Sequence, residues 1–284
     1  NNMPPGNTTT PAPQLALITG ASSGIGAAFA RDLAARGSHL ILVARRRERL
    51  ESLADQLRTT HHVNVEVLPA DLAQEAGMSR VEERISTSDP LDLLINNAGF
   101  GTPGAFAQIP LTKTTQMLTL HVMASTRLTW HALQKMLPRN HGSIINVSSI
   151  AAFLLYPTAV SYCSTKVYLN VFSEALQNQL RDTQITIQSL CPGFTHTEFH
   201  ATEAYQASFD HSRIPAWMWM TADEVVNQSL RALEKQQVIV IPGLKNRLLV
   251  KLMTAPITSQ LLKPIMAKAV NARKKSGSPP SSKS

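Results

Sequence analysis

Tyr162 and Lys166 are the residues whose types and spacing point most directly to chemistry. They stand four positions apart, so a helix would place both side chains on one face. A nearby ammonium stabilises a tyrosinate, and this makes a phenol usable as a general acid or base near neutral pH. A surface tyrosine and lysine can share this spacing without any role, so the surrounding sequence must decide.

Polar and glycine-containing motifs follow several strand-like apolar runs. Ser149 ends the stretch Asn146-Val-Ser-Ser149 and lies thirteen residues before Tyr162. The other motifs are Asp71-Leu72, Asn96-Asn-Ala-Gly99 and Pro192-Gly-Phe-Thr-His-Thr197. In open parallel sheets, ligands bind at the carboxyl ends of the strands. The sequence therefore predicts a single site that collects all of these motifs.

A glycine-rich loop, Thr19-Gly-Ala-Ser-Ser-Gly-Ile-Gly26, separates the first apolar run from the first helical pattern. Gly20 permits a tight turn, Gly24 lets the backbone approach a phosphate, and Gly26 lets the helix pack against the strand. A helix that begins here points unpaired N–H groups and a positive dipole at a pyrophosphate. A bare glycine-rich turn is the alternative, but the strand–loop–helix context favours dinucleotide binding.

The end of the second apolar run, Val43-Ala-Arg-Arg-Arg47, indicates which dinucleotide would bind. An NAD site usually has Asp or Glu here to bind the ribose 2′-hydroxyl, and no carboxylate precedes Glu48. An arginine can instead bind a 2′-phosphate through two hydrogen bonds. We therefore expect NADP(H), with Arg45 as the main contact, Arg46 beside it and Ser22 as a hydroxyl partner. The alternative is a solvated helix start, although cations are unfavourable at a helix N-terminus.

The elements that must position these residues alternate along residues 14–242. Apolar runs typical of buried strands occupy residues 15–18, 40–43, 63–68, 91–95, 143–147, 185–190 and 238–241. Helical patterns occupy residues 24–36, 48–57, 114–137 and 162–181, and a capping box at Thr221 and Glu224 starts another. This order predicts an α/β fold of one domain, a doubly wound Rossmann-type parallel sheet of about seven strands with helices on both faces.

With these motifs in this order, residues 14–242 resemble the classical short-chain dehydrogenase/reductase (SDR) family. The resemblance implies that Tyr162 protonates a substrate carbonyl while hydride arrives from the nicotinamide, that Lys166 binds the nicotinamide ribose, and that Ser149 orients the carbonyl oxygen. The implied cofactor-binding residues, besides Tyr162 and Lys166, are Gly20, Ser22, Ser23, Gly24, Ile25, Gly26, Arg45, Arg46, Asp71, Leu72, Asn97, Ala98, Gly99, Pro192, Gly193, Thr195 and Thr197. The resemblance to the family also implies a homodimer or homotetramer that pairs through helices 114–137 and 162–181. No metal site is expected.

His121 departs from the family pattern. The family usually has an Asn within a Leu-Asn-Val stretch of this long helix, where the Asn supports a proton relay to the Lys. Here the stretch reads Leu120-His-Val122. A histidine can donate and accept hydrogen bonds, so a relay is chemically possible. The alternative is favoured equally: a histidine whose hydrogen bonds are satisfied inside the helix and which takes no part in catalysis.

Large apolar side chains flank the substrate side. Resemblance to the family implies that an insertion at about residues 196–220 covers the site; it contains Phe199, Tyr205, Phe209 and Trp217-Met-Trp-Met220. The stretch Phe153-Leu-Leu-Tyr156 faces the same cleft in the resemblance. Such residues favour a bulky apolar carbonyl compound over a sugar, and ordinary core packing is the alternative.

The formal net charge of +8 divides unevenly along the 284 residues. Nine Lys and Arg residues and no acid follow Gly243, which leaves a nearly neutral body. Residues 243–271 have helical apolar spacing, and we expect a basic amphipathic segment that packs on the body or a partner in preference to an anionic membrane surface. No aromatic platform accompanies the charge, so nucleic-acid binding is not expected. Residues 1–13 and 272–284 are polar and are expected to be disordered.

The sequence contains no run of about eighteen apolar residues, so it predicts no membrane-spanning helix. Two cysteines without ligand spacing fit a reducing, cytoplasmic setting. The predicted function is an NADP(H)-dependent oxidoreductase that interconverts a carbonyl and an alcohol on a small-molecule substrate. A non-catalytic NADP-binding sensor or scaffold and an acyl-thioester (3-oxoacyl) reductase are the alternatives.

Overall fold

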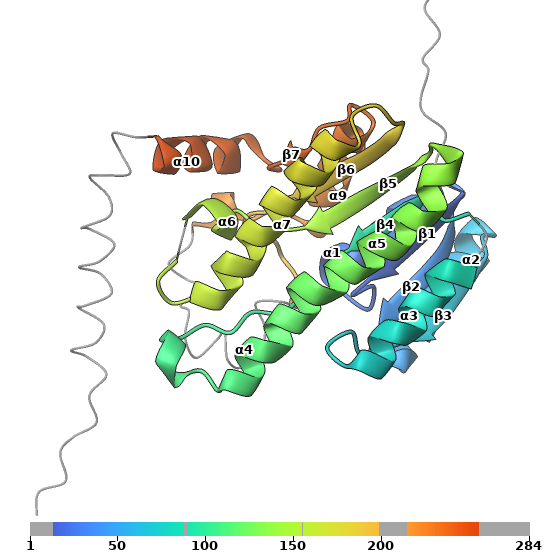
Figure 1. Ribbon diagram of the computed structural model, residues 1–284, viewed down its shortest axis with the longest axis horizontal. Coiled ribbons are helices and arrows are strands. Elements are labelled where there is room, and N and C mark those ends of the chain that lie inside the picture. Colours follow the sequence, from blue (N-terminus) through green and yellow to red (C-terminus); the bar gives the residue numbers. More distant parts are fainter. Residues whose placement is uncertain (1–13, 88–89, 155, 199–214, 256–284) are drawn as a thin grey trace, which may run out of the picture.

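The protein is represented by a computed structural model that describes residues 14–87, 90–154, 156–198 and 215–255. All seven strands lie in one sheet, in the order β3-β2-β1-β4-β5-β6-β7, and every neighbouring pair is parallel (Figure 1). The strands are β1 (Leu15–Thr19), β2 (His39–Ala44), β3 (Val65–Pro69), β4 (Leu93–Asn96), β5 (Gly142–Val147), β6 (Ile185–Leu190) and β7 (Ile239–Val240). The predicted doubly wound parallel sheet is confirmed.

Helices cover both faces of the sheet. They are α1 (Gly24–Ala35), α2 (Arg47–His61), α3 (Glu75–Thr87), α4 (Leu111–Leu118), the π-helix η2 (Thr119–Ala124), α5 (Ser125–Met136), α6 (Ala151–Leu154), α7 (Val160–Gln179), α9 (Ala222–Leu233) and α10 (Leu244–Thr254). The described ranges also contain three short 3-10 turns: η1 (Phe106–Gln108), η3 (Leu137–Arg139) and η6 (Ala216–Met218). The capping box predicted at the start of α9 is present, because Thr221 and Glu224 each accept the other's backbone N–H.

Two apolar layers sandwich the sheet, and they explain why the strands read as unbroken apolar runs. In β1, Ala16 and Ile18 pack in the layer under α1, α2 and α9, whereas Leu17 packs in the layer under α3 and α5. Successive side chains of a strand point to opposite faces, so a strand covered on both faces must be apolar throughout.

Two helical segments differ from the sequence expectation. Helix α3 was not predicted, although Met78, Val81 and Ile85 line its buried face. The long helix expected at 114–137 is divided, because η2 inserts a π-helical turn between α4 and α5. Hydrophobic spacing cannot report one wider turn, and π-turns of this kind occur frequently at functional sites.

Helix α10 occupies the first part of the predicted segment 243–271, and residues 256–271 lie outside the described ranges. One face of α10 packs against α6, in a cluster that includes Val250, Leu249 and Met253. The expected packing on the body is therefore present for this face. Within the described ranges, no helix has the length and hydrophobicity needed to cross a bilayer. The termini 1–13 and 272–284 also lie outside these ranges.

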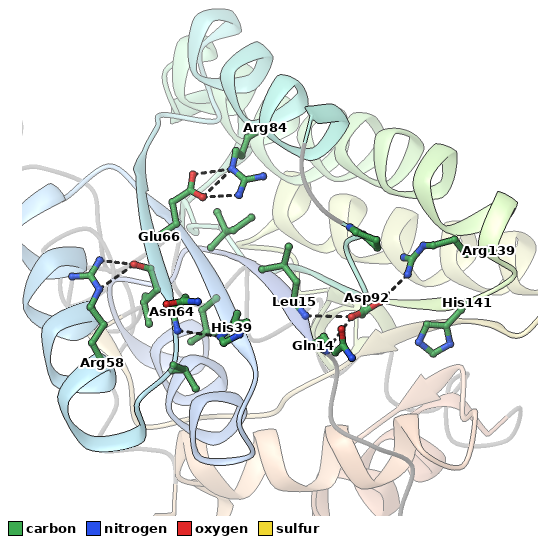
Figure 2. Close-up of a pocket in the computed structure, with 15 residues that line it drawn as sticks. Gln14, Leu15, His39, Arg58, Asn64, Glu66, Arg84, Asp92, Arg139 and His141 are labelled. Atoms are coloured by element: carbon green, nitrogen blue, oxygen red, sulfur yellow. Dashed lines mark hydrogen bonds and ion pairs between the residues drawn. The ribbon is translucent and has the colours of Figure 1, made fainter.

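A cavity of about 890 Å³ lies at the amino-terminal edge of the sheet, where β1, β2 and β3 begin. Figure 2 shows two ion pairs in its lining, because Arg84 binds Glu66 (Nε–Oε1, 2.9 Å) and Arg139 binds Asp92 (Nη1–Oδ1, 3.0 Å), whereas Arg58 donates to the backbone carbonyl of Val65. Asp92 also accepts the backbone N–H of Gln14. These ion pairs and hydrogen bonds hold the first residues of the strands in place. None of the predicted site residues lines this cavity.

Candidate active site

A second cavity, of about 490 Å³, lies at the carboxyl edge of the sheet and is lined by nearly all of the predicted site residues. The loops after β1 to β6 all contribute to it. The predicted residues that line it are Gly20, Ser22, Ser23, Gly24, Ile25, Arg45, Arg46, Asp71, Leu72, Asn97, Ala98, Gly99, Ser149, Tyr162, Lys166, Pro192, Gly193, Thr195 and Thr197. Gly26 and His121 are absent from the lining, because both lie behind the cavity wall.

The glycine loop leaves no room for side chains. Gly20 has φ +67° and Gly24 has φ +56°, conformations that favour glycine. A Cβ on Gly26 would lie 2.4 Å from the carbonyl oxygen of Gly20. Ser23, the N-cap of α1, makes no side-chain capping bond, so its side chain does not satisfy the N–H groups of the first turn. This narrow, N–H-rich cradle fits the pyrophosphate of a dinucleotide.

Thr19 and Asn97 clamp the ends of β1 and β4 together beneath the cavity. The Thr19 hydroxyl accepts the backbone N–H groups of Asn97 (2.9 Å) and Ala98 (3.0 Å) and donates to the carbonyl oxygen of Ile95. The Asn97 amide donates to the carbonyl oxygens of Thr19 (2.9 Å) and Gly20 (3.3 Å). The clamp fixes the floor on which an adenosine or ribose would rest.

Lys166 is a buried cation. Its side chain is 5% exposed, and its Nζ donates to the carbonyl oxygen of Val147 at 2.8 Å. None of the described carboxylates forms an ion pair with it. Burial lowers the pKa of Lys166 to about 8. The ammonium lies 5.5 Å from the centroid of the Tyr162 ring, as the four-residue spacing predicts.

Ser149 and Tyr162 meet at the same cavity from β5 and α7. The Ser149 Oγ accepts the N–H of Ala151 at 3.1 Å, which orients the hydroxyl and leaves its hydrogen available to a ligand. A second tyrosine, Tyr156, also lines the cavity, but burial raises its pKa to about 12. The phenol beside the ammonium, Tyr162, is therefore the better placed of the two for proton transfer.

His121 is fully committed to internal hydrogen bonds. The N–H of Phe100 donates to its Nε2 at 3.1 Å, so the network assigns the proton of the neutral ring to Nδ1, which lies 2.9 Å from the Thr165 hydroxyl. Thr165 in turn donates to the carbonyl oxygen of Tyr162 at 2.8 Å. Burial, together with the charge of Lys166, holds the pKa of His121 well below its usual range. The ring thus supports the turn that carries Tyr162.

Arg45 and Arg46 both line the cavity at the end of β2, and Arg46 makes side-chain hydrogen bonds there. Its guanidinium donates to Ser22 Oγ and Ser23 Oγ, each at 3.0 Å from Nη2, and to the carboxylate of Glu198 at 2.9 Å from Nη1. Arg49 binds the other oxygen of Glu198. Hydrogen bonds from Arg49 and Arg46 lower the pKa of Glu198. Sequence reasoning missed Glu198; its position directly after Thr197 was the available signal.

The apolar side chains that line the cavity include Phe100, Leu120, Tyr156 and Phe194. The tryptophans of the insertion are not in the lining. Trp217 is 58% exposed, and the ring of Trp219 stacks on His196 at 4.8 Å. The other aromatic residues of the expected cover, Phe199, Tyr205 and Phe209, lie outside the described ranges. No cluster of three potential metal-ligating side chains occurs among the described residues.

Replacing His121 by Phe should change how stability depends on pH. In the folded protein, the pKa of His121 lies well below its ordinary value of 6.5. Below pH 6.5 the unfolded chain therefore binds more protons than the folded protein, so the stability of the fold falls as the pH falls. Removing His121 lowers that slope between pH 5 and 6.5 by at most about 1.4 kcal/mol per pH unit. The lost hydrogen bonds should also destabilise the protein by about 1–3 kcal/mol at pH 8.

Denaturant unfolding at a series of pH values measures both effects. His141→Phe, at an exposed position, is the control and should keep the wild-type slope. Equal slopes for His121→Phe and the wild type would show that folding does not shift the pKa of His121, against its burial as a neutral ring.

Comparison with known proteins agrees with this geometry. The model of the short chain dehydrogenase family matches residues 14–207. A very-long-chain 3-oxoacyl-CoA reductase-like protein of Arabidopsis thaliana is 34% identical over 187 residues. The match spans 64% of this chain and 60% of that protein, so the chain corresponds to less than two thirds of its length.

Two solved structures extend the similarity over nearly the whole chain. A short-chain dehydrogenase from Sphingobium yanoikuyae in complex with NADPH has a TM-score of 0.75 and 30% identity, covering 95% of this chain and 98% of that one. A bulky-bulky ketone specific alcohol dehydrogenase from Comamonas testosteroni has a TM-score of 0.73 and 28% identity, covering 97% and 98%. With its seven-stranded sheet, its glycine cradle and its Ser, Tyr and Lys on one cavity, the chain belongs to the short chain dehydrogenase family of oxidoreductases.

Proposed function

We propose that this protein is an NADP(H)-dependent oxidoreductase that interconverts a carbonyl and an alcohol on a bulky apolar substrate. The observation that carries the proposal is that Ser149, Tyr162 and Lys166 line the same cavity as the glycine cradle and the arginines after β2. The intact set of three argues against a non-catalytic NADP-binding sensor or scaffold. In that alternative, nothing would require a buried ammonium beside a tyrosine.

In the proposed reaction, bound nicotinamide exchanges a hydride with the substrate carbon. Ser149 donates its free hydroxyl hydrogen to the carbonyl oxygen and holds it toward Tyr162. Tyr162 gives that oxygen a proton in the reducing direction and takes the proton back in the oxidising direction. Lys166 stabilises the resulting phenolate, because its ammonium is held next to the ring by burial and by the Val147 carbonyl.

Preference for NADP(H) is proposed from the charge at the end of β2. Arg45 and Arg46 line the cavity, and Arg46 reaches two loop hydroxyls that could share a phosphate with it. The carboxylate of Glu198 now holds the guanidinium of Arg46. A 2′-phosphate would compete with Glu198 for Arg46, since both are anionic acceptors.

The bulky apolar substrate is proposed from the side chains of Phe100, Leu120 and Phe194, which line the cavity near the reacting groups. The name of the Comamonas testosteroni neighbour supports a bulky ketone. The name of the Arabidopsis thaliana relative favours a second candidate, a 3-oxoacyl thioester. Competition by coenzyme A esters in a ketone-reduction assay separates the two: strong competitive inhibition indicates a thioester reductase.

Tyr162→Phe should lower kcat by about a thousandfold and leave cofactor affinity unchanged, because only the transferable proton is removed. Turnover is measured as NADPH consumption over a panel of apolar ketones, and cofactor binding by calorimetry. Tyr156→Phe is the matched control at the same cavity and should stay within about tenfold of wild-type kcat. Retained turnover in Tyr162→Phe would mean that another group is the acid. Tight NADPH binding without wild-type turnover on any ketone would support the sensor.

Charge changes at the end of β2 should alter discrimination between the two cofactors. Arg46→Asp should weaken NADPH binding by about 10- to 100-fold and NADH binding far less, because charged hydrogen bonds to a phosphate are lost. Arg45→Asp should act in the same sense, and Arg47→Asp is the exposed control. Glu198→Gln should tighten NADPH by freeing Arg46.

The dissociation constants of both cofactors for each variant are the measurement. Equal losses for NADPH and NADH in Arg46→Asp would remove this arginine as the discriminator. An unchanged NADPH affinity in Glu198→Gln would show that the carboxylate does not compete with the phosphate.

A homodimer that pairs through α4, α5 and α7 is also proposed. Leu118, Met123 and Trp130 on α4 to α5, and Val171 on α7, are large apolar side chains exposed to solvent. Trp130→Glu should reduce the molar mass measured by light scattering from two chains or four to a smaller unit, because a charge would be buried at the interface. A wild-type mass of one chain at micromolar concentration would contradict the proposal.

A further inference from the structure

Helix α10 presents an apolar stripe to solvent outside the active site. Leu244, Leu248 and Leu252 are 75%, 67% and 54% exposed, although each is a large aliphatic side chain. Four-residue spacing places them in one stripe about 80° wide along the helix. Scattered apolar side chains are ordinary on a protein surface, but a continuous stripe on a terminal helix indicates a surface that contacts something.

The opposite face of α10 is fixed to the body, so the stripe cannot rotate inward. Val250 is buried in a cluster with Ile150 and Leu154. Asn246 is 2% exposed, donates to the carbonyl oxygen of Pro242 at 2.8 Å, and packs so closely on Gly193 that a Cβ there would lie 2.5 Å from it. In Figure 1, α10 lies beside α6 at the end of the molecule remote from α2 and α3.

Trp217 extends the stripe beyond the N-terminus of α10. The Lys245 Nζ lies 5.2 Å from the centroid of its ring and also donates to its carbonyl oxygen at 3.4 Å. Tryptophan beside lysine is a combination favoured at the boundary between water and lipid, because the ring is apolar and its N–H is polar. The tryptophan belongs to the turn η6, which ends the insertion after β6.

Positive charge borders the stripe on both sides. At about 100° per residue, Lys245 lies at one edge, and Arg247 and Lys251 lie at the other. All three are exposed, and none forms an ion pair within the described part of the chain. The helix contains no acid, and neither does the sequence that follows Gly243.

We infer that the α10 stripe, with Trp217, docks the protein on an anionic membrane surface. A leucine stripe between cations is the pattern of helices that lie in the plane of a lipid interface. A second copy of this chain fits less well, because a two-fold contact through the stripe would bring Lys245, Arg247 and Lys251 against the same cations of its partner.

Docking in this way would bring the catalytic cavity close to the lipid. Phe153 and Tyr156 belong to the same apolar cluster as α10, and Tyr156 also lines the cavity. This consequence rests on the proposed function, since it gives a bulky apolar substrate a short path from the membrane. The docking itself does not rest on the proposed function, because vesicle binding is measured without turnover.

Co-sedimentation of the full chain with vesicles tests the inference. The wild type should bind vesicles containing phosphatidylserine, bind phosphatidylcholine vesicles weakly, and dissociate as salt is raised. Leu244→Ser with Leu248→Ser should lower the partition coefficient about tenfold or more, because two apolar side chains no longer enter the lipid. The net charge is unchanged, so the basic residues after Thr254 contribute equally to both proteins.

Matched controls separate the stripe from general effects. Leu111→Ser with Leu137→Ser removes two exposed leucines elsewhere and should leave vesicle binding unchanged. Lys245→Gln with Lys251→Gln should weaken binding to anionic vesicles more than Lys113→Gln with Lys235→Gln, which removes the same charge at exposed positions distant in the sequence.

Two results would overturn the inference. One is wild-type binding to anionic vesicles that the α10 serine variant retains in full, which would assign binding to charge alone. The other is an absence of wild-type binding to phosphatidylserine vesicles, and a smaller molar mass for the α10 serine variant would then identify the stripe as a contact between copies. Loss of turnover with intact vesicle binding would count against the proposed function alone.

Discussion

Burial of the Lys166 ammonium is the constraint on which the rest of the site depends. A charge removed from water without a carboxylate partner is costly, and the depressed pKa of about 8 expresses that cost. Among the described residues, the Val147 carbonyl is the one hydrogen-bond acceptor of the Lys166 Nζ, so the cation favours any anionic or hydroxyl-bearing group that enters the cavity. A phenolate at Tyr162 is such a group. Burial keeps His121 neutral, and the charge of Lys166 adds to this effect.

Rigid polar contacts between strand ends keep that arrangement in register. Asn96 donates to the Oδ1 of Asn146 at 2.9 Å, and Asn146 donates to the hydroxyl of Ser173 on α7 at 3.0 Å. This buried chain ties β4 and β5 to the helix that carries the tyrosine and lysine, and the Thr19–Asn97 clamp ties β1 to β4. Buried hydrogen bonds of this kind rigidify a fold because breaking one leaves its donor and acceptor unpaired. Ser149, Tyr162 and Lys166 therefore lie on the same cavity as the glycine loop, which is far from them in the sequence.

The sequence predicted the parts of the site that local physics dictates. The parallel sheet follows from apolar runs, and the glycine cradle follows from backbone conformations that only glycine adopts freely, as at Gly20 and Gly24. Features set by tertiary contacts could not be derived in this way. Helix α3 contains Gly77 in its first turn because a Cβ would meet the Asp71 carbonyl at 2.2 Å, and that glycine weakens the helical signal. Nor does spacing reveal that Arg46, instead of Arg45, turns toward Ser22, or that Glu198 crosses from the loop after β6 to meet it.

His121 stands where the family usually has an Asn, and its ring is constrained both by the local helix geometry and by tertiary contacts. The π-turn of η2 carries the ring, and Gly99 leaves it room, since a Cβ there would lie 2.9 Å from Nε2. Both ring nitrogens are then consumed by Phe100 and Thr165, so a proton could pass through this ring only if one of those bonds broke. Breaking an internal hydrogen bond leaves a buried polar group unpaired, which costs more free energy than a formed bond contributes to stability. This cost favours a supporting role for the ring under Tyr162. In the proposed reaction, the proton that Tyr162 gives up would then be replaced by a route that does not pass through this ring.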